Sequence, residues 1–317
     1  MNRQIPGIHH VTAIASNPQQ NIDFYTGFLG LRLVKLTVNF DDPESYHLYY
    51  GDSVGSPGTA LTFFAWPGAP RGRTGAGQVV TTSLSIPPDS VDFWLERFSE
   101  HDVAFRGPDD RIEEKVISFL DPDGLKLELV AHADPHTVEP WQDSPVPARY
   151  ATRGFRGVTI SETSPGATEL LLAETMGLHR SEERDGRVRY ETPGEVPGRI
   201  VDVLSEPGWP PGRVAVGTVH HVAWRAGDDQ EQLDWRDEIA GLGIAVTPVI
   251  DRRYFHSIYF REPGGVLFEI ATDPPGFAVD EPVDALGTSL KLPPWLEASR
   301  PQIERRLPPL TALRRVA

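Results

Sequence analysis

A single pattern of predicted secondary structure occurs four times along the chain, and this internal repetition constrains the fold more than any other feature of the sequence. Each copy begins with a short apolar strand, continues with a helix and ends with two or three further strands. The helices are expected at about residues 21–28, 90–100, 167–176 and 230–242. The four copies span about residues 6–68, 77–132, 153–206 and 215–273.

The copies are also related in pairs. Residues 29–32 (Leu-Gly-Leu-Arg) in the first copy correspond to residues 176–179 (Met-Gly-Leu-His) in the third. The turn at residues 121–124 (Asp-Pro-Asp-Gly) in the second copy corresponds to residues 262–265 (Glu-Pro-Gly-Gly) in the fourth. The first copy therefore matches the third and the second matches the fourth, which predicts an α+β chain of two homologous halves.

The domain boundaries follow from these repeats. The first domain is expected at residues 1–135 and the second at residues 151–273, with the proline-rich residues 136–150 as a linker between them. Residues 274–317 form a C-terminal tail whose apolar side chains, such as Trp295, are too many for a disordered segment. We expect this tail to pack on the domains.

Composition excludes several classes of function. The chain has 317 residues, of which 39% are hydrophobic and 24% charged, and these values are typical of a globular protein. It has no cysteine, so any metal must be held by imidazole and oxygen ligands. The net charge of −15 disfavours nucleic-acid and membrane partners. No apolar segment resembles a membrane span or a signal peptide, so we expect a cytoplasmic protein, for which a homo-oligomer is one option.

Two pairs of histidines occupy matching strands of the repeats. His9-His10 lies in the first strand of the first copy and His220-His221 in the first strand of the fourth, whose last strand contains Glu269. Adjacent residues of a strand point to opposite faces, so only one histidine of each pair can face the inside of a curved sheet. An unpaired carboxylate would be costly in the apolar strand that carries Glu269, and a metal cation would remove that cost. Two histidines and one carboxylate are the ligands of an open metal site.

The segment 251–261 is the second place where chemistry is expected. It leads into a strand that forms a hairpin with the strand of Glu269 through Pro263-Gly264-Gly265, and a three-residue loop would place Tyr259 opposite Glu269 on the same face. His256 is a further candidate acid or base in this segment.

Several motifs closely resemble the hydroquinone-type ring-cleaving dioxygenases of the vicinal oxygen chelate superfamily, and the similarity covers most of the chain. They are the residues 7–12 (Gly-Ile-His-His-Val-Thr), 24–41 (beginning Phe-Tyr-Thr-Gly), 218–224 (Thr-Val-His-His-Val-Ala-Trp), 251–261 (beginning Asp-Arg-Arg-Tyr) and 293–297 (Pro-Pro-Trp-Leu-Glu). The resemblance implies four βαβββ modules in two homologous tandem domains, each a curved mixed sheet around a cup. It also implies that the first and fourth modules together line one cup, and the second and third modules another.

The resemblance assigns roles to particular side chains. It implies that His10, His221 and Glu269 bind the metal. In that case, Thr12 shares the face of His10, and His9, His220 and His256 are candidates for positions around the ligands. The family position of Arg252 and Tyr259 is close to the substrate. Arg252 would stabilise an anionic phenolate, and Tyr259 would exchange a proton with a substrate oxygen.

The number of ligands separates the possible chemistries. A glyoxalase I would need a fourth ligand near Phe63, where the sequence offers none. In the second cup the matching positions are Thr81, Glu128, Gly157 and about Val203, so we expect only Glu128 to remain there, in a structural site. Three ligands leave room for a substrate oxygen and dioxygen on one ion. Fe(II) is the expected ion, and Mn(II) is the second choice.

The expected function is therefore an Fe(II)-dependent ring-cleaving dioxygenase that inserts both atoms of O2 into small aromatic diols, preferably substituted or unsubstituted hydroquinones. Three alternatives remain open. The chain could be a catechol extradiol dioxygenase, a redox-neutral metal enzyme (a glyoxalase-like lyase or a fosfomycin-type transferase), or a metal-free binding protein. Dependence on iron and uptake of oxygen would separate the dioxygenases from the others.

Overall fold

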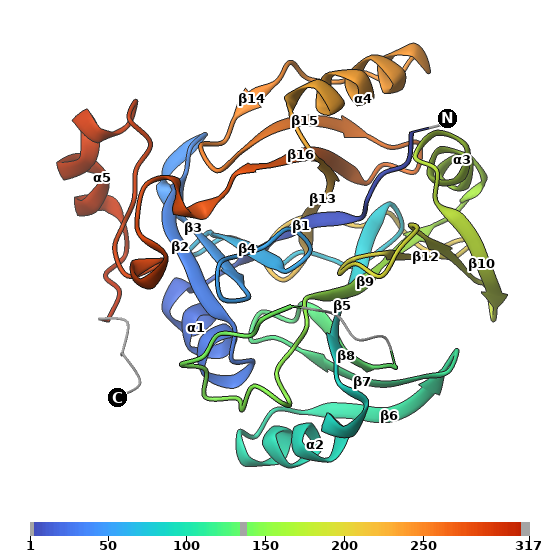
Figure 1. Ribbon diagram of the computed structural model, residues 1–317, viewed down its shortest axis with the longest axis horizontal. Coiled ribbons are helices and arrows are strands. Elements are labelled where there is room, and N and C mark those ends of the chain that lie inside the picture. The colour runs from blue at the N-terminus through green and yellow to red at the C-terminus, as the bar shows by residue number, and fades with distance from the viewer. Residues whose placement is uncertain (1–2, 134–137, 312–317) are drawn as a thin grey trace.

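The computed structural model describes residues 3–133 and 138–311 of the chain. The end of the predicted first domain at residue 135 and the start of the predicted linker at residue 136 lie outside the described residues. The described residues form two eight-stranded mixed sheets with few helices (Figure 1), which confirms the predicted α+β class. Each sheet combines one copy of the repeat from each half of the sequence.

The first sheet has the strand order β14-β15-β16-β13-β1-β4-β3-β2. Its strands come from the first and fourth copies: β1 (Ile8–Ala15), β2 (Arg32–Asn39), β3 (Asp42–Gly51), β4 (Ala60–Ala65), β13 (Val219–Ala226), β14 (Ile250–Asp251), β15 (Phe255–Arg261) and β16 (Leu267–Pro275). In each copy the first strand lies parallel to the last. The antiparallel pairing of β1 with β13 joins the two copies at the centre of the sheet.

The second sheet repeats this plan with the strand order β10-β11-β12-β9-β5-β8-β7-β6. Its strands come from the second and third copies: β5 (Gln78–Ile86), β6 (Phe105–Arg111), β7 (Glu114–Leu120), β8 (Lys126–Ala131), β9 (Phe155–Glu162), β10 (His179–Arg184), β11 (Arg187–Glu191) and β12 (Ile200–Ser205). The antiparallel pair β5–β9 takes the central place that β1–β13 has in the first sheet.

Among the described residues, four α-helices lie where the repeats predict them, and a fifth lies in the C-terminal tail, outside the repeats. They are α1 (Pro18–Ile22) with a π-helical continuation (Asp23–Phe28), α2 (Val91–Glu100), α3 (Gly166–Leu170) with a π-helical continuation (Leu171–Thr175), α4 (Asp229–Gly241) and α5 (Arg300–Arg306). The Asn17 side chain begins α1 by accepting hydrogen bonds from the backbone N–H groups of Gln19 and Gln20. Gly30 follows the first helical segment with a positive φ of 71°, which suits a glycine at a helix end.

Helix α4 shows how a module builds its core. Its buried side chains Trp235 and Ile239 lie on one helix face, and the helix contacts β13, β15 and β16 (Figure 1). Gln232 is also buried there and donates hydrogen bonds from Nε2 to the backbone oxygens of His256 and Ile270, at 2.7 Å each. The helix therefore supports the two strands that carry Tyr259 and Glu269 from behind.

The described part of the C-terminal tail runs along the outer edge of the first sheet, beside β2 (Figure 1). The Lys291 N–H donates to the oxygen of Leu36, and Phe277, Leu286 and Leu292 are buried. Trp295 stays 51% exposed and touches Phe40 with its ring edge. Among the described residues, no helix is long and apolar enough to cross a membrane.

Candidate metal centre

Both histidine pairs sit at irregularities in the pairing of β1 with β13. Ile8 lies opposite Trp224 and His10 opposite Ala223, so His9 is an extra residue of β1. In the same way, Thr12 lies opposite His221 and Ala13 opposite Val219, which leaves His220 as an extra residue of β13. Such bulges redirect side chains that strict alternation would send to the opposite face.

The bulges correct one expectation from the sequence. Alternation predicts that His9 and His220 point away from the inside of the cup, but each ring lies beside that of its neighbour. The two Nδ1 atoms are 2.9 Å apart in His9-His10 and 2.8 Å apart in His220-His221. His220 even lines the cavity together with His221.

Three side chains converge at the centre of this sheet. His10 Nε2 lies 3.5 Å and His221 Nε2 3.0 Å from Glu269 Oε2, and the two Nε2 atoms are 3.4 Å apart. All three residues are buried, and Glu269 Oε2 has no hydrogen-bond partner among the described residues. Ligand atoms at right angles and about 2.1 Å from one ion would lie about 3.0 Å apart. The three atoms therefore fit one face of a metal ion's coordination sphere.

The neighbouring side chains prepare these atoms for a cation. When His10 and His221 offer Nε2 lone pairs, their Nδ1–H groups can donate to Nδ1 of His9 and His220. Burial, followed by the charges of nearby groups, holds the pKa of His9 well below its usual value and lowers the pKa of His220 to about 3, so both rings are neutral acceptors. The other carboxylate oxygen of Glu269, Oε1, accepts a hydrogen bond from Ser257 Oγ at 2.5 Å.

Glu269 is ionised although it is fully buried. Burial alone would raise the pKa of its carboxyl group, but the contacts with His10 and His221 hold that pKa well below its usual value. The site therefore presents one fixed negative charge and two imidazoles, which is the charge pattern that a divalent cation needs.

Tyr259 and Arg252 lie beside the convergent atoms. Tyr259 is directly opposite Glu269 in the pairing of β15 with β16, as the hairpin predicts. Arg252 Nε donates to Tyr259 Oη at 3.2 Å, and its Nη1 lies 2.9 Å from Asp41 Oδ2. Burial lowers the pKa of Arg252 but the contacts with Tyr259 and Asp41 raise it more, so this side chain is a permanent cation at the cavity.

Of the remaining candidate residues, Thr12 lies inside the cup and His256 does not. Thr12 is buried on the inside, with its Oγ1 2.8 Å from Thr62 Oγ1. His256 is not brought to the convergent atoms, because it lies one residue from the inward-facing Ser257 on β15. Its Nδ1 instead pairs with Asp229 Oδ1 of α4 at 2.5 Å.

The position that matches Glu269 in the first module is Thr62, one residue before the expected Phe63. Glu269 pairs with Ala223 of β13, and Thr62 pairs with Thr12 of β1 in the same relative register. Phe63 is fully buried on the other face of β4. A threonine hydroxyl is a weak substitute for a carboxylate, so this position does not complete a four-ligand site.

Sequence reasoning missed two side chains of the cavity, His47 and Tyr49 of β3. His47 Nε2 lies 3.0 Å from Thr62 Oγ1, and Tyr49 Oη lies 2.9 Å from His47 Nδ1. Tyr49 pairs with Thr62 as Tyr259 pairs with Glu269. Extending the repeat comparison from the ligands to the neighbouring strands would have identified both residues.

These side chains surround a cavity of about 340 Å³. Phe64, Trp66 and Phe255 supply apolar walls, whereas Asn39 at the end of β2 and Asp41 in the β2–β3 turn supply polar groups. A cavity of this size accepts a single substituted aromatic ring. Convergent polar groups in an otherwise aromatic cavity are typical of a site for a small ligand.

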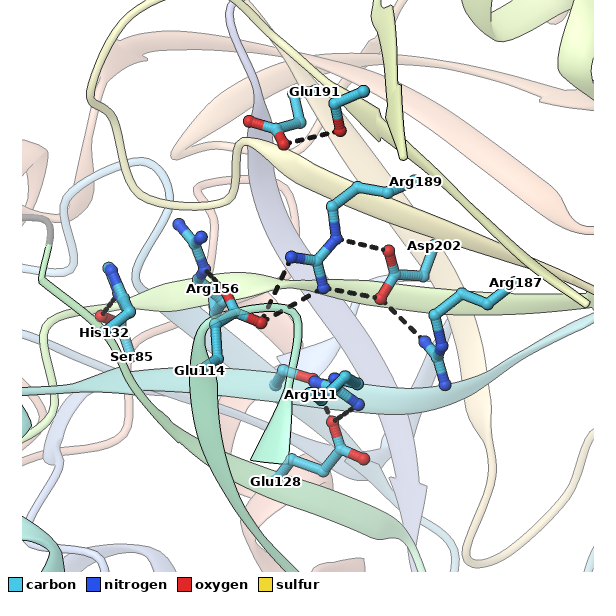
Figure 2. Close-up of polar contacts among 12 residues, drawn as sticks. Ser85, Arg111, Glu114, Glu128, His132, Arg156, Arg187, Arg189, Glu191 and Asp202 are labelled. Atoms are coloured by element: carbon cyan, nitrogen blue, oxygen red, sulfur yellow. Dashed lines mark hydrogen bonds and ion pairs between the residues drawn. The ribbon is translucent and has the colours of Figure 1, made fainter. Parts of the chain in front are cut away.

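The second cup differs in composition (Figure 2). Glu128 lies at the expected position, but the partner of Thr159 that matches Glu269 is Asp202 and not Val203. The second cup thus keeps two carboxylates, which corrects the expectation of one. Each is neutralised by arginine: Arg111 Nη1 lies 2.9 Å from Glu128, and Arg189 Nε lies 2.8 Å from Asp202.

Further ion pairs fill this cup. Arg187 contacts Asp202 at 2.7 Å, and Arg189 and Arg156 both contact Glu114, at 3.2 and 2.6 Å. Arg156 is the extra residue at the β9 irregularity that matches His9 in β1. In this second cup, arginine guanidinium groups therefore supply the positive charge next to the carboxylates that a metal ion would supply in the first cup.

The chain is similar to one large protein family. Residues 7–129 and 159–270 match the family model of the Glyoxalase/Bleomycin resistance protein/Dioxygenase superfamily. A Bacillus subtilis (strain 168) protein named "Putative ring-cleaving dioxygenase MhqO" is 47% identical over 98% of each chain. The "Chlorohydroquinone/hydroquinone 1,2-dioxygenase" of Sphingobium indicum is 33% identical over 96% of each chain.

Solved structures share the fold. The crystal structure of a Bacillus subtilis protein described as a putative dioxygenase superposes with a TM-score of 0.94 at 47% identity and covers 98% of each chain. Glyoxalase I from Zea mays, at 14% identity, superposes with a TM-score of 0.62 over 84% of this chain and 92% of its own. The likeness to glyoxalase I concerns the fold alone.

Proposed function

Since the chain belongs to the Glyoxalase/Bleomycin resistance protein/Dioxygenase superfamily, we propose that it is an Fe(II)-dependent dioxygenase that cleaves the ring of small aromatic diols, with hydroquinones as preferred substrates. The observation that carries this proposal is the convergence of His10, His221 and Glu269 next to an aromatic cavity of about 340 Å³. Relatives named as ring-cleaving and hydroquinone dioxygenases, similar over nearly the whole chain, support it.

The ligand set supports an oxygen-activating metal over a redox-neutral one. His10, His221 and Glu269 would hold the ion, and Thr62 stands where a glyoxalase-like site would need its fourth ligand. A bound Fe(II) would supply the electron exchange that lets dioxygen react with an electron-rich ring, and Mn(II) fits the same ligands. Zn(II) has no redox chemistry, so a zinc-loaded protein should be inactive.

The side chains of the cavity would orient the substrate. Phe64, Trp66 and Phe255 can hold the flat ring, and Arg252 can stabilise a phenolate oxygen because its guanidinium is half-buried and permanently charged. Burial first, and then the Glu269 charge, raise the pKa of Tyr259. Tyr259 is therefore a neutral phenol that can donate a hydrogen bond to a substrate oxygen.

Oxygen consumption tests the proposal. Purified protein is loaded anaerobically with Fe(II), Mn(II) or Zn(II), mixed with hydroquinones or catechols, and followed with an oxygen electrode. We expect uptake with Fe(II) and hydroquinones, and none with Zn(II) or with His221→Ala. Absence of uptake with every diol at full Fe(II) occupancy would refute the dioxygenase proposal, and faster uptake with catechols would change the substrate class.

A further inference from the structure

We propose that Tyr49 and His47 of β3 form a proton relay, in which Tyr49 contacts the bound diol and His47 stores the proton that a diol hydroxyl loses. The inference rests on the proposed function and adds a residue pair to it. It stands on the internal symmetry of the cup, on three hydrogen-bond distances and on the position of both side chains at the cavity.

The symmetry of the cup gives Tyr49 a defined position. Tyr49 lies opposite Thr62 on β4, just as Tyr259 lies opposite Glu269 on β16. The two tyrosines therefore flank the convergent ligand atoms from the two modules. Both line the cavity, where Tyr49 is buried and Tyr259 is half-buried.

The partners of the two tyrosines differ. Tyr259 Oη accepts a hydrogen bond from Arg252 Nε, a group that cannot take up a proton. Tyr49 Oη lies 2.9 Å from His47 Nδ1, which is a base. A phenol is a stronger acid than a threonine hydroxyl, so Tyr49 donates to Nδ1 while His47 donates from Nε2 to Thr62 Oγ1.

His47 is held in place from both sides. In the fourth module the matching position is Ser257, which donates to Glu269. In the first module the ligand position is Thr62, whose Oγ1 lies between His47 Nε2 at 3.0 Å and Thr12 Oγ1 at 2.8 Å. A histidine thus replaces the serine in the module whose carboxylate ligand is missing.

The relay requires that His47 begins as the neutral form. Burial, followed by the charges of His10 and His221, keeps the pKa of His47 well below its usual value. An anionic substrate oxygen in the cavity would add the negative charge that stabilises a protonated His47. The proton would therefore move only when a diol is bound.

The transfer balances in protons and charge. A substrate O–H bond breaks and its proton passes to Tyr49 Oη, while the proton of Tyr49 passes to His47 Nδ1. The substrate becomes an anion and His47 becomes a cation, with both Tyr49 and Thr62 unchanged. The stored proton returns through Tyr49 to the ring-opened product, so the relay is reset after each turnover.

Proton counting during anaerobic binding tests the relay without turnover. Hydroquinone is added to Fe(II)-loaded holoenzyme in weakly buffered solution with a pH indicator, for the unmodified protein, His47→Gln, Tyr49→Phe and the control Tyr46→Phe. Tyr46 is on the same strand, but its hydroxyl donates to the oxygen of Pro308. We expect about one more proton released to solvent per hydroquinone bound by His47→Gln than by the control.

Turnover gives a second readout. Because the two side chains act as one unit, we expect kcat to fall by about 100-fold in His47→Gln and in Tyr49→Phe, and the double variant to be no slower than either. Equal proton release by His47→Gln and the control, or additive losses of kcat, would overturn the relay. The unmodified protein could bind hydroquinone and differ from His47→Gln in proton release, yet consume no oxygen. That result would refute the proposed function and leave the relay standing. If the unmodified protein binds no diol, both fail.

Discussion

The candidate metal centre depends on Glu269 more than on any other residue. It is fully buried, its Oε2 has no hydrogen-bond partner among the described residues, and two histidine nitrogens lie 3.0 and 3.5 Å from that oxygen. A carboxylate in such a place needs nearby positive charge, which a divalent cation held by His10, His221 and Glu269 would supply. Removing its charge should therefore remove the cation.

We predict that Glu269→Gln weakens Fe(II) binding by more than about 100-fold, because a neutral amide replaces the only anionic ligand. Anaerobic titration with Fe(II) and metal analysis after gel filtration measure the affinity. Glu128→Gln is the matched control, since Glu128 has the corresponding position in the second cup but is paired with Arg111. Equal Fe(II) affinity in the two variants would contradict the assignment of the ligands.

Arg252 supports a second prediction at this scale. Its guanidinium reaches Tyr259 Oη with Nε and Asp41 with Nη1, and a lysine ammonium cannot span both partners. Arg252→Lys should therefore lower kcat/KM for hydroquinone by at least about tenfold while Fe(II) content stays the same. Steady-state oxygen uptake measures this ratio, and an unchanged kcat/KM would show that Arg252 does not contact the substrate.

Among the elements, strands and helices could be predicted well from the sequence, and side-chain directions less well. Apolar runs, helix ends at Gly30 and the hairpin at residues 262–265 follow from local pattern, and Tyr259 does lie opposite Glu269. The directions of His9 and His220 do not follow, because a bulge depends on the partner strand, which local sequence does not specify.

The hairpin between β15 and β16 carries the third prediction. Glu162, at the end of β9, lies against Glu262 of this hairpin. Burial first, and then Glu262, raise the pKa of Glu162 to about 8 from 4.5. A raised folded-state pKa contributes stability that is present below about pH 4.5 and is lost as the pH rises through about 8.

Glu162→Gln removes this titration. The unfolding temperature of the variant, minus that of the unmodified protein, should therefore increase as the pH rises from about 5 to about 8. Thermal unfolding followed by circular dichroism at both pH values measures the gain. Glu174→Gln, which changes an exposed carboxyl group on the same module, should show no such pH dependence. A difference independent of pH would rule out the raised pKa of Glu162.

At the scale of the whole molecule, the two cups are built alike and filled differently. Repeats in the sequence indicate four related modules, but the pairing of the first with the fourth is a long-range property that only the family resemblance implied. The strand register also matters for the site. The expected positions Val203 and Phe63 are each one residue away from the observed positions Asp202 and Thr62, and this shift of one residue exchanges a polar side chain for an apolar one. Only the paired strands show that shift.

The fourth prediction concerns the ion pairs of the second cup (Figure 2). Arg189 is 3% exposed and contacts both Asp202 and Glu114, so its loss leaves two buried carboxylates short of a partner. Arg189→Met should lower the free energy of unfolding by about 3–5 kcal/mol. Urea unfolding measures it, with Arg184→Met on an exposed strand as control. Similar losses in both variants would mean that the cup is not held by these pairs.

The most direct test of the central claim is the stoichiometry of the reaction and the mass of its product. Fe(II)-loaded protein is given hydroquinone and oxygen, and consumed oxygen, consumed hydroquinone and product mass are measured together. The account predicts one O2 consumed per hydroquinone, a ring-opened product heavier by both oxygen atoms, and no hydrogen peroxide. Formation of quinone with hydrogen peroxide, or conversion of a substrate without oxygen consumption, would contradict it.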